Sequence, residues 1–156
     1  MERSQAGADG VTRIVEVGAK DETAREATAE AWLVTTSEAV EHMVAGTKKG
    51  SPIETAKIAG VIGAKRTPDL LPHCHPIRIT GAEVAVDPDI GVGRVRVRAT
   101  VRAVDRTGVE MEALTAATVA ALSLYDTAKA FDRAGRIEGV RLLAKSGGAS
   151  GDYAAT

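Results

Sequence analysis

The stretch Arg94 to Val104, RVRVRATVRAV, alternates small apolar residues with arginines along most of its length. Successive side chains of an extended strand point to opposite faces, so this alternation gathers the apolar side chains on one face. That face consists of Val95, Val97, Ala99, Val101 and Ala103, and the other carries Arg94, Arg96, Arg98 and Arg102. The stretch therefore predicts a strand that is buried on one face only.

The segments before this strand predict the first half of the fold. Ile77 to Val86 is expected to be a strand with a β-bulge near Gly81, where its apolar positions change parity. Asp87 to Gly93 is expected to be a turn. Farther upstream, the expected segments are a strand over Glu30 to Thr36, a helix capped by Ser37 that runs to about Ala45, a basic loop from Gly46 to Gly50, and a helix from Pro52 to about Arg66.

The segments after the strand predict the second half. Asp105 to Gly108 should turn, an Ala-rich helix should run from about Leu114 to Phe131, and Gly139 to Ala144 should form a last strand. The first two helices can be counted as one crossover in the resulting order β-α-α-β-β-α-β. The order then predicts an α+β fold, a ferredoxin-like split-βαβ sandwich whose antiparallel sheet carries its helices on one face.

Two adjoining segments have unusual composition. The helix that begins at Pro52 carries a small-residue surface, which predicts that another backbone approaches it closely because two glycines are costly inside a helix. This surface consists of Ala56, Ala59, Gly60, Gly63 and Ala64. The next segment, Thr67 to Pro76, contains three prolines and is expected to be extended and stiff.

The length and composition suit one domain. In a chain of 156 residues, we expect a disordered leader over residues 1–10, one domain over residues 11–150 and a tail over residues 151–156. Apolar residues make up 44% of the chain but aromatic residues only 3%, so small side chains must build the core. Such side chains bury less area per residue, and we expect other subunits to complete part of the core.

Charge and cysteine content restrict the function classes. A formal net charge of -1 provides no global attraction to nucleic acid or to a membrane, and no aromatic residues interleave the arginine row. The single cysteine, Cys74, excludes an internal disulfide and suits a reducing compartment. No apolar run suggests a signal peptide or a membrane span. We therefore expect a cytoplasmic protein with no nucleic-acid or membrane partner.

The sequence His73-Cys74-His75 lies inside the proline-rich segment. A rigid segment is suited to holding a catalytic histidine in place. Two alternatives remain, a histidine packed in a loop and a metal site with Cys74 as a ligand. The metal site would lack a second cluster of ligands at a familiar spacing.

Three carboxylates and several basic side chains are further candidates for catalytic or binding residues. If Glu110 and Glu112 lie on an extended segment, both carboxylates point one way and Met111 points the other; otherwise they are acids that favour a helix N-terminus. Asp126 and Lys129 share a helix face, as a reactive pair or an exposed ion pair. The basic candidates are Lys48 and Lys49 between glycines, Lys65 and Arg66 at the expected helix end, and Lys145 before Gly147-Gly148.

Together these residues resemble the cyclic pyranopterin monophosphate synthase family, the C protein of molybdenum cofactor synthesis. The resemblance is carried by KDETAREATAE (Lys20 to Glu30), KIAGVIGAKRTPDLLPHCHP (Lys57 to Pro76), TGVEMEALTAATVAALSLYDTAKA (Thr107 to Ala130) and VRLLAKSGG (Val140 to Gly148). One position departs from the pattern, because His73 stands where the family usually has an apolar residue. The resemblance therefore points to His75 as the catalytic histidine.

The resemblance implies a reaction and an assembly. It implies conversion of 3′,8-cyclo-7,8-dihydroguanosine 5′-triphosphate into cyclic pyranopterin monophosphate and pyrophosphate, after a radical enzyme has cyclised GTP. It implies a homohexamer arranged as a trimer of dimers, with active sites at subunit interfaces. No metal site and no tightly bound cofactor are implied, although Mg²⁺ can accompany the substrate triphosphate.

The resemblance also implies roles for individual residues. The implied catalytic groups are Lys49, His75, Glu110, Glu112, Asp126 and Lys129. We expect Lys49, Asp126 and Lys129 to be drawn together from separate segments, with His75 and Glu110 lining the same pocket. The implied substrate-binding groups are Arg25, Lys65, Arg66, Cys74, Met111 and Lys145. Clustered acids, bases and cations suit a rearrangement with several proton transfers and a pyrophosphate leaving group. The alternatives are a non-catalytic regulatory module that binds a nucleotide and a metal-binding module built on His73, Cys74 and His75.

Overall fold

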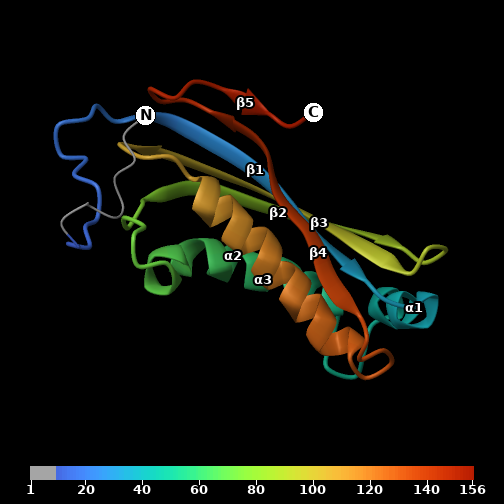
Figure 1. Ribbon diagram of the computed structural model, residues 1–156. Coiled ribbons are helices and arrows are strands. Elements are labelled where there is room, and N and C mark those ends of the chain that lie inside the picture. Colours follow the sequence, from blue (N-terminus) through green and yellow to red (C-terminus); the bar gives the residue numbers. More distant parts are fainter. Residues whose placement is uncertain (1–9) are drawn as a thin grey trace.

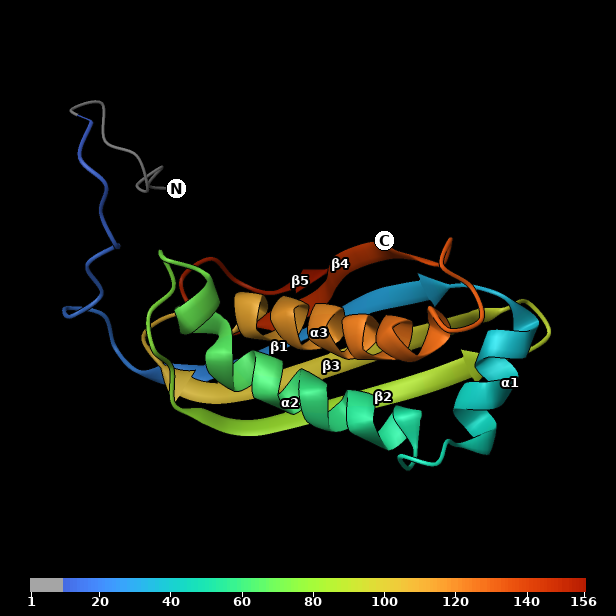
Figure 2. The same cartoon turned by 90° about the horizontal axis from the view of Figure 1, so that it is seen from below.

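The computed structural model describes residues 10–156, so the leader expected over residues 1–10 lies almost entirely outside the described residues. A sheet of five strands carries two long helices, α2 and α3, on one face, and the shorter α1 lies at one end (Figures 1 and 2). The strands are β1 (Thr23–Val34), β2 (Ile79–Asp89), β3 (Arg94–Asp105), β4 (Arg136–Ser146) and β5 (Tyr153–Ala154). The helices are α1 (Ser37–Ala45), α2 (Pro52–Leu70) and α3 (Glu110–Ala128).

The strand order β2-β3-β1-β4-β5, with every neighbouring pair antiparallel, confirms the ferredoxin-like α+β prediction. β3, the strand of alternating arginines, lies between β2 and β1. The register shifts between Ile79 and Gly81, which confirms the bulge expected in β2. β5 was not expected: it forms within the predicted tail, where Tyr153 pairs with Lys145.

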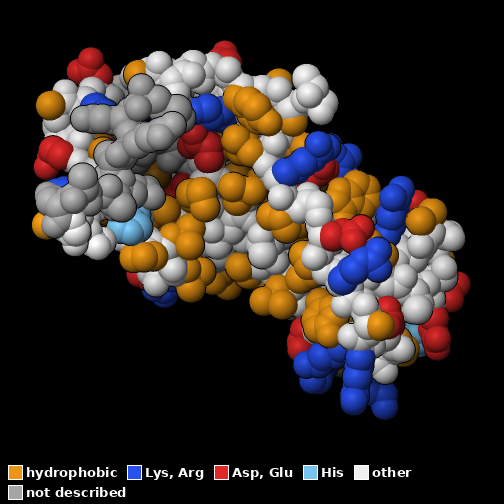
Figure 3. Space-filling view, in the orientation of Figure 1, with side chains coloured by type: hydrophobic (Ala, Val, Ile, Leu, Met, Phe, Trp, Pro, Cys, Tyr) orange, Lys and Arg blue, Asp and Glu red, His pale blue; other side chains and the backbone are white. Residues whose placement is uncertain are grey.

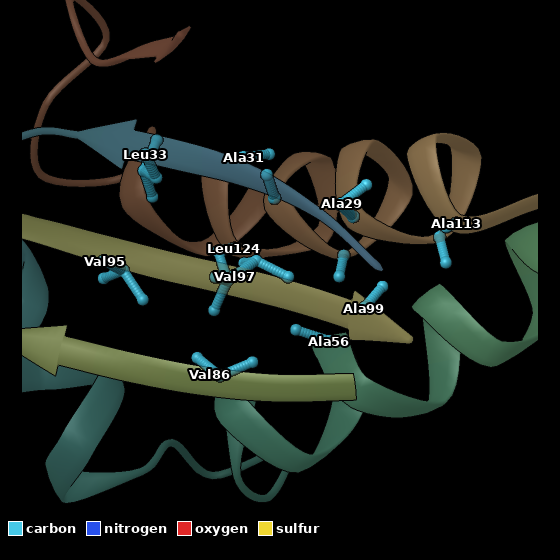
Figure 4. Close-up of a cluster of buried hydrophobic side chains, with 14 of the residues drawn as sticks. Ala29, Ala31, Leu33, Ala56, Val86, Val95, Val97, Ala99, Ala113 and Leu124 are labelled. Atoms are coloured by element: carbon cyan, nitrogen blue, oxygen red, sulfur yellow. The ribbon is translucent and has the colours of Figure 1, made fainter. Parts of the chain in front are cut away.

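The core lies between the sheet and the helices and consists mainly of alanine and valine. The five alternating apolar side chains of β3 are buried there, between 0% and 2% exposed, whereas Val104 near its end is 47% exposed. The five are Val95, Val97, Ala99, Val101 and Ala103. Figure 4 shows Val95, Val97 and Ala99 on the same side of the sheet as Leu124 of α3. The alternation in Arg94 to Val104 therefore correctly identified the buried face of this strand.

The small-residue surface of α2 packs directly on α3, as predicted. A Cβ atom on Gly60 would lie 3.0 Å from the carbonyl oxygen of Ala116 and 3.2 Å from Cβ of Ala120. A Cβ atom on Gly63 would lie 3.0 Å from Cβ of Val119. Because these distances leave almost no room for a larger side chain, glycine sets the spacing of the two helices.

Both long helices differ from their predicted limits. α3 begins at Glu110 rather than near Leu114, and the Ala113 N–H closes its first turn on the Val109 carbonyl at 3.1 Å. Glu110 and Glu112 therefore belong to the first turn of the helix, where the partial positive charge of the helix N-terminus stabilises carboxylates. α3 also ends at Ala128, three residues before Phe131.

α2 continues through Pro68 to Leu70, so the expectation of an extended segment from Thr67 was wrong for its first four residues. The buried Thr67 hydroxyl donates to the Gly63 carbonyl at 3.2 Å, and the Leu71 N–H donates to Thr67 at 2.9 Å. These bonds hold the last turn although Pro68 has no N–H of its own to donate.

The remaining corrections concern strand and helix ends. β1 begins at Thr23, seven residues before the predicted start at Glu30, because its ladder with β3 extends to the pair Thr23 and Asp105. β4 is also longer than the predicted Gly139 to Ala144. The residue that caps α1 is Thr36 rather than Ser37, since its side chain accepts the Ala39 N–H.

The second face of the sheet carries the arginine row, and acids of neighbouring strands pair with it. Glu30 of β1 is 2% exposed and lies between Arg96 of β3, at 2.6 Å, and Arg141 of β4, at 2.7 Å. Burial alone would raise the pKa of Glu30, but hydrogen bonds from both arginines lower it below its ordinary value. The arginines therefore join three strands.

None of the helices within residues 10–156 combines the length and apolarity needed to cross a membrane.

Candidate active site

Glu110 and Lys145 meet at the N-terminal end of α3. Lys145, near the end of β4, places its Nζ 3.1 Å from Oε1 of Glu110 and also donates to the Ser150 hydroxyl at 2.6 Å. Both partners of the ion pair are largely shielded, with side chains 20% and 29% exposed. We call Glu110, Glu112, Lys145, Cys74 and Arg25 the N-terminal cluster.

Glu112 differs from Glu110 in burial. The helix turns by about 100° per residue, so the two carboxylates leave α3 in different directions, contrary to the extended arrangement considered above. Glu112 points inward and is 2% exposed, whereas Met111 is 41% exposed. Burial, with smaller contributions from the charges of Glu110 and Asp105, raises the pKa of Glu112 to about 7. At neutral pH this carboxyl group can therefore both donate and accept a proton.

The segment that follows α2 brings the His73-Cys74-His75 motif to the same end of the molecule. Burial raises the pKa of the Cys74 thiol, and the charge of nearby Glu112 raises it further. His75 is half-buried, and the His73 ring contacts the Arg13 carbonyl through Nδ1 at 3.1 Å. Among the residues that the structure describes, no three His, Cys, Asp or Glu side chains gather as a metal-binding group.

Arg25 of β1 lies beneath the Gly147-Gly148 turn. Its guanidinium faces the carbonyls of Asp105 and Arg106, at 3.4 and 3.5 Å. A Cβ atom on Gly147, whose φ is +88°, would clash with the Ala24 carbonyl oxygen, and Gly148 also has a positive φ of +85°, which side chains rarely adopt. Glycine is therefore required for the turn to cover the guanidinium, a packing reason for the two glycines after Lys145 that sequence reasoning did not find.

Asp126 and Lys129 meet at the other end of α3. Lys129 donates to Oδ1 of Asp126 at 2.6 Å, and both side chains are exposed. The hydrogen bond from Lys129, its charge and the charge of Lys49 lower the pKa of Asp126. We call Lys49, Asp126 and Lys129 the C-terminal cluster. Basic side chains project together at the lower edge of Figure 3, beneath the C-terminal end of α3 in Figure 1.

An apolar groove adjoins the C-terminal cluster. It has a volume of about 500 Å³, and Asp126 and Lys129 lie on its wall. The rest of its lining comes from α2 and α3, namely Ala59, Val119, Leu122, Ser123 and Tyr125. An apolar groove with a few charged groups at one end suits a flat heterocycle with polar substituents.

The two clusters do not share a pocket within one chain. Glu110 and Asp126 are separated by sixteen residues of continuous helix, which at 1.5 Å per residue places them about 24 Å apart. The expectation that Glu110, His75, Lys49, Asp126 and Lys129 line one pocket is therefore not met by a single subunit.

Lys65 and Arg66 lie on the part of α2 nearest the N-terminal cluster. The two helices run antiparallel (Figures 1 and 2), and a Cβ atom on Gly63 would meet Thr115 and Val119, whereas one on Gly60 would meet Ala116 and Ala120. Lys65 and Arg66 are both exposed, and Arg66 pairs with Asp69 one turn later at 3.2 Å. Their position suits either a solvent-exposed helix end or a basic rim beside the cluster.

Comparison with known proteins identifies the family of the chain. The model of the MoaC family matches residues 14–148. A cyclic pyranopterin monophosphate synthase of Roseiflexus sp. (strain RS-1) is 50% identical over 145 residues, 92% of each chain. The synthase of the same name from Brucella ovis is 49% identical and covers 93% of this chain and 88% of its own. The one from Methylobacterium sp. (strain 4-46) is 49% identical over 149 residues, 95% of this chain and 93% of its own. The chain belongs to the MoaC family.

Proposed function

We propose that this protein is a cyclic pyranopterin monophosphate synthase of molybdenum cofactor biosynthesis. Its substrate is 3′,8-cyclo-7,8-dihydroguanosine 5′-triphosphate, supplied by a radical enzyme that cyclises GTP, and its products are cyclic pyranopterin monophosphate and pyrophosphate. The relatives that bear this name align with more than nine tenths of the chain. The main structural support for the proposal is the ion pair of Asp126 and Lys129, which lies on the wall of an apolar groove. Lys49 is close enough for its charge to act on Asp126.

The chemistry requires proton transfers while the purine ring opens and closes again as a pterin. Lys129 and Lys49 would supply protons and Asp126 would accept one. Because the ion pair raises the pKa of Lys129 and lowers that of Asp126, the bound substrate would have to separate the pair before either group transfers a proton. Glu112, with a pKa of about 7, can act as an acid or a base at physiological pH. The apolar groove would cover one face of the heterocycle while these groups act.

The second part of the reaction forms the cyclic phosphate. A hydroxyl group of the substrate loses its proton to a general base and attacks the α-phosphorus. The bond between the α-phosphorus and the oxygen that bridges to the β-phosphate breaks, and pyrophosphate departs with its negative charge. Lys145 and Arg25, with Lys65 and Arg66 on the exposed rim, would neutralise that charge. A Mg²⁺ ion carried by the triphosphate would add to this neutralisation, and no tightly bound cofactor is required.

The separation of the clusters supports an active site shared by two subunits. A twofold axis perpendicular to α3 that passes beside the middle of the helix would place one copy's Glu110 end against the other copy's Asp126 end. Two equivalent composite sites would result. We propose that these dimers assemble into a hexamer, a trimer of dimers, in the cytoplasm.

Incubation with the purified cyclised triphosphate tests the activity directly. Mass spectrometry should detect cyclic pyranopterin monophosphate, and one pyrophosphate should be released for each product molecule. GTP itself should give no product. Tight binding of the substrate without turnover would instead favour the nucleotide-binding regulatory module. Light scattering should give a mass near six times the 16.2 kDa subunit.

A further inference from the structure

Two exposed rings stack beside the C-terminal cluster. The His42 and Phe131 rings lie nearly parallel, with centroids 4.2 Å apart and planes inclined by 13°. His42 occupies the last turn of α1, and Phe131 follows Lys129 by two residues. Phe131 is 42% exposed and neither ring belongs to the buried core, so filling the core does not explain the pair.

The Phe131 side of the stack is anchored to the sheet and to α3. Phe131 donates its N–H to the Ala128 carbonyl at 2.8 Å, which continues the end of α3. The next residue, Asp132, accepts a hydrogen bond from Thr35 at 2.9 Å, just after β1. Because both ends are tied, Phe131 keeps a set position relative to Asp126 and Lys129.

The His42 side carries the loop that contains Lys49. The His42 carbonyl accepts the Gly46 N–H at 3.1 Å, which ends α1 and starts the loop. Within the loop, Thr47 and Gly50 exchange two backbone hydrogen bonds of 2.9 Å, and the Lys49 N–H donates to the Thr47 hydroxyl at 3.1 Å. The loop is therefore internally braced and follows the end of α1 as a unit.

We propose that the His42–Phe131 stack is a positioning clamp that sets the Lys49 loop against Asp126 and Lys129. The stack joins the end of α1 directly to the segment after α3, and Lys49 lies only seven residues beyond His42. The ammonium group of Lys49 is close enough to act electrostatically on Asp126. His42 and Phe131 are positioning residues, because they would act through Lys49 and need not touch the substrate.

The inference rests on the proposed function for its kinetic test. Phe131→Ala and His42→Ala should each lower kcat about tenfold with little change in KM, since small displacements of catalytic groups slow chemistry more than binding. Phe131→Tyr and His42→Phe retain two stacked rings and should keep nearly the wild-type kcat. Tyr153→Ala removes another exposed ring, 46% exposed on β5, and should have no effect. Equal losses in the aromatic and alanine variants would overturn the clamp.

A double substitution shows whether the clamp acts through Lys49. In a Lys49→Ala background, measured at high enzyme concentration, Phe131→Ala should cause no further loss of rate because the group being positioned is already missing. A further tenfold loss in that background would contradict the proposal.

Hydrogen exchange tests the clamp without any turnover. The amide proton of Gly46, which bonds to the His42 carbonyl at the end of α1, should exchange several-fold faster in Phe131→Ala and His42→Ala than in the wild type or in Phe131→Tyr. Unchanged exchange in both alanine variants would reject the clamp, even if the enzyme is active. Absence of product from the wild type would reject the proposed function, whereas the exchange rates would still decide the clamp.

Discussion

Lys129 donates a hydrogen bond of 2.6 Å to Asp126 one turn earlier in the chain, at the opposite end of α3 from the buried Glu112. The hydrogen bond raises the pKa of Lys129 and lowers that of Asp126, so both groups are charged at neutral pH. Exposed ion pairs contribute little to stability. The pair can therefore be changed by mutation to test its chemistry with little effect on folding.

Lys49→Ala, Asp126→Asn and Lys129→Ala should each reduce turnover by at least about a hundredfold, as expected for loss of a general acid or base. Their melting temperatures should stay within a few degrees of the wild type because all three side chains are exposed. Lys57→Ala breaks an exposed pair of the same spacing, with Glu54 at 2.7 Å, and is the matched control with unchanged turnover. Wild-type rates in the two lysine variants would remove both lysines from the mechanism.

Glu112 should make the folded state less stable as the pH rises. Folding raises its pKa from the ordinary 4.5 to about 7, so between these values the folded protein holds a proton that the unfolded chain has lost. The free energy of unfolding must then fall as pH increases through this window. Glu112→Gln removes the ionisable carboxyl group. The melting temperature of this variant should therefore exceed that of the wild type by more at pH 8 than at pH 5.

Calorimetry at both pH values measures this difference. Glu41→Gln, an exposed change on α1, controls for the loss of one negative charge. If the melting temperatures of Glu112→Gln and the wild type differ by the same amount at both pH values, Glu112 is already ionised at pH 5 in the folded protein.

The two histidines of the His73-Cys74-His75 motif should differ in their effect on activity. His73→Leu removes a ring that contacts the Arg13 carbonyl, and we expect nearly wild-type kcat. His75→Ala should lower kcat about a hundredfold if His75 transfers a proton during the reaction. Steady-state kinetics of both variants decide the assignment, which would be reversed by a large loss in His73→Leu alone.

Mixing two inactive variants should restore activity if two subunits share each site. Lys129→Ala damages the C-terminal cluster and Glu110→Gln the N-terminal cluster, so random assembly of the two chains leaves about a quarter of composite sites intact. Co-expression from one plasmid, with two different tags to isolate mixed assemblies, provides the material. Each variant expressed alone is the control, and a mixture as inactive as its components would place the whole site within one subunit.

Arg66→Ala should weaken binding of the triphosphate more than binding of the uncharged nucleoside analogue. Higher salt screens phosphate charge, so the affinity of the wild type should fall more steeply with salt than that of the variant. Isothermal titration of both ligands at two salt concentrations measures this. If Arg66→Ala lowers the affinity for both ligands equally, Arg66, which pairs with Asp69, only completes the end of α2.

The sequence alone determined the layers and their order. The period of two in Arg94 to Val104 marks the buried face of β3, and the small residues of α2 mark its contact with α3. Both signals are local, because a strand or helix repeats its faces at a fixed interval whatever lies elsewhere in the chain. The sequence also identified the chemical types of the candidate residues and the family.

The tertiary structure alone decided how those residues are grouped. Glu110 and Glu112 look alike in sequence, yet only packing shows that one pairs with Lys145 while the other is buried. The stack of His42 on Phe131 joins residues 89 positions apart and has no signature in either segment. The length of α3 separates Glu110 from Asp126, because a continuous helix fixes the distance between its ends and no local pattern can shorten it.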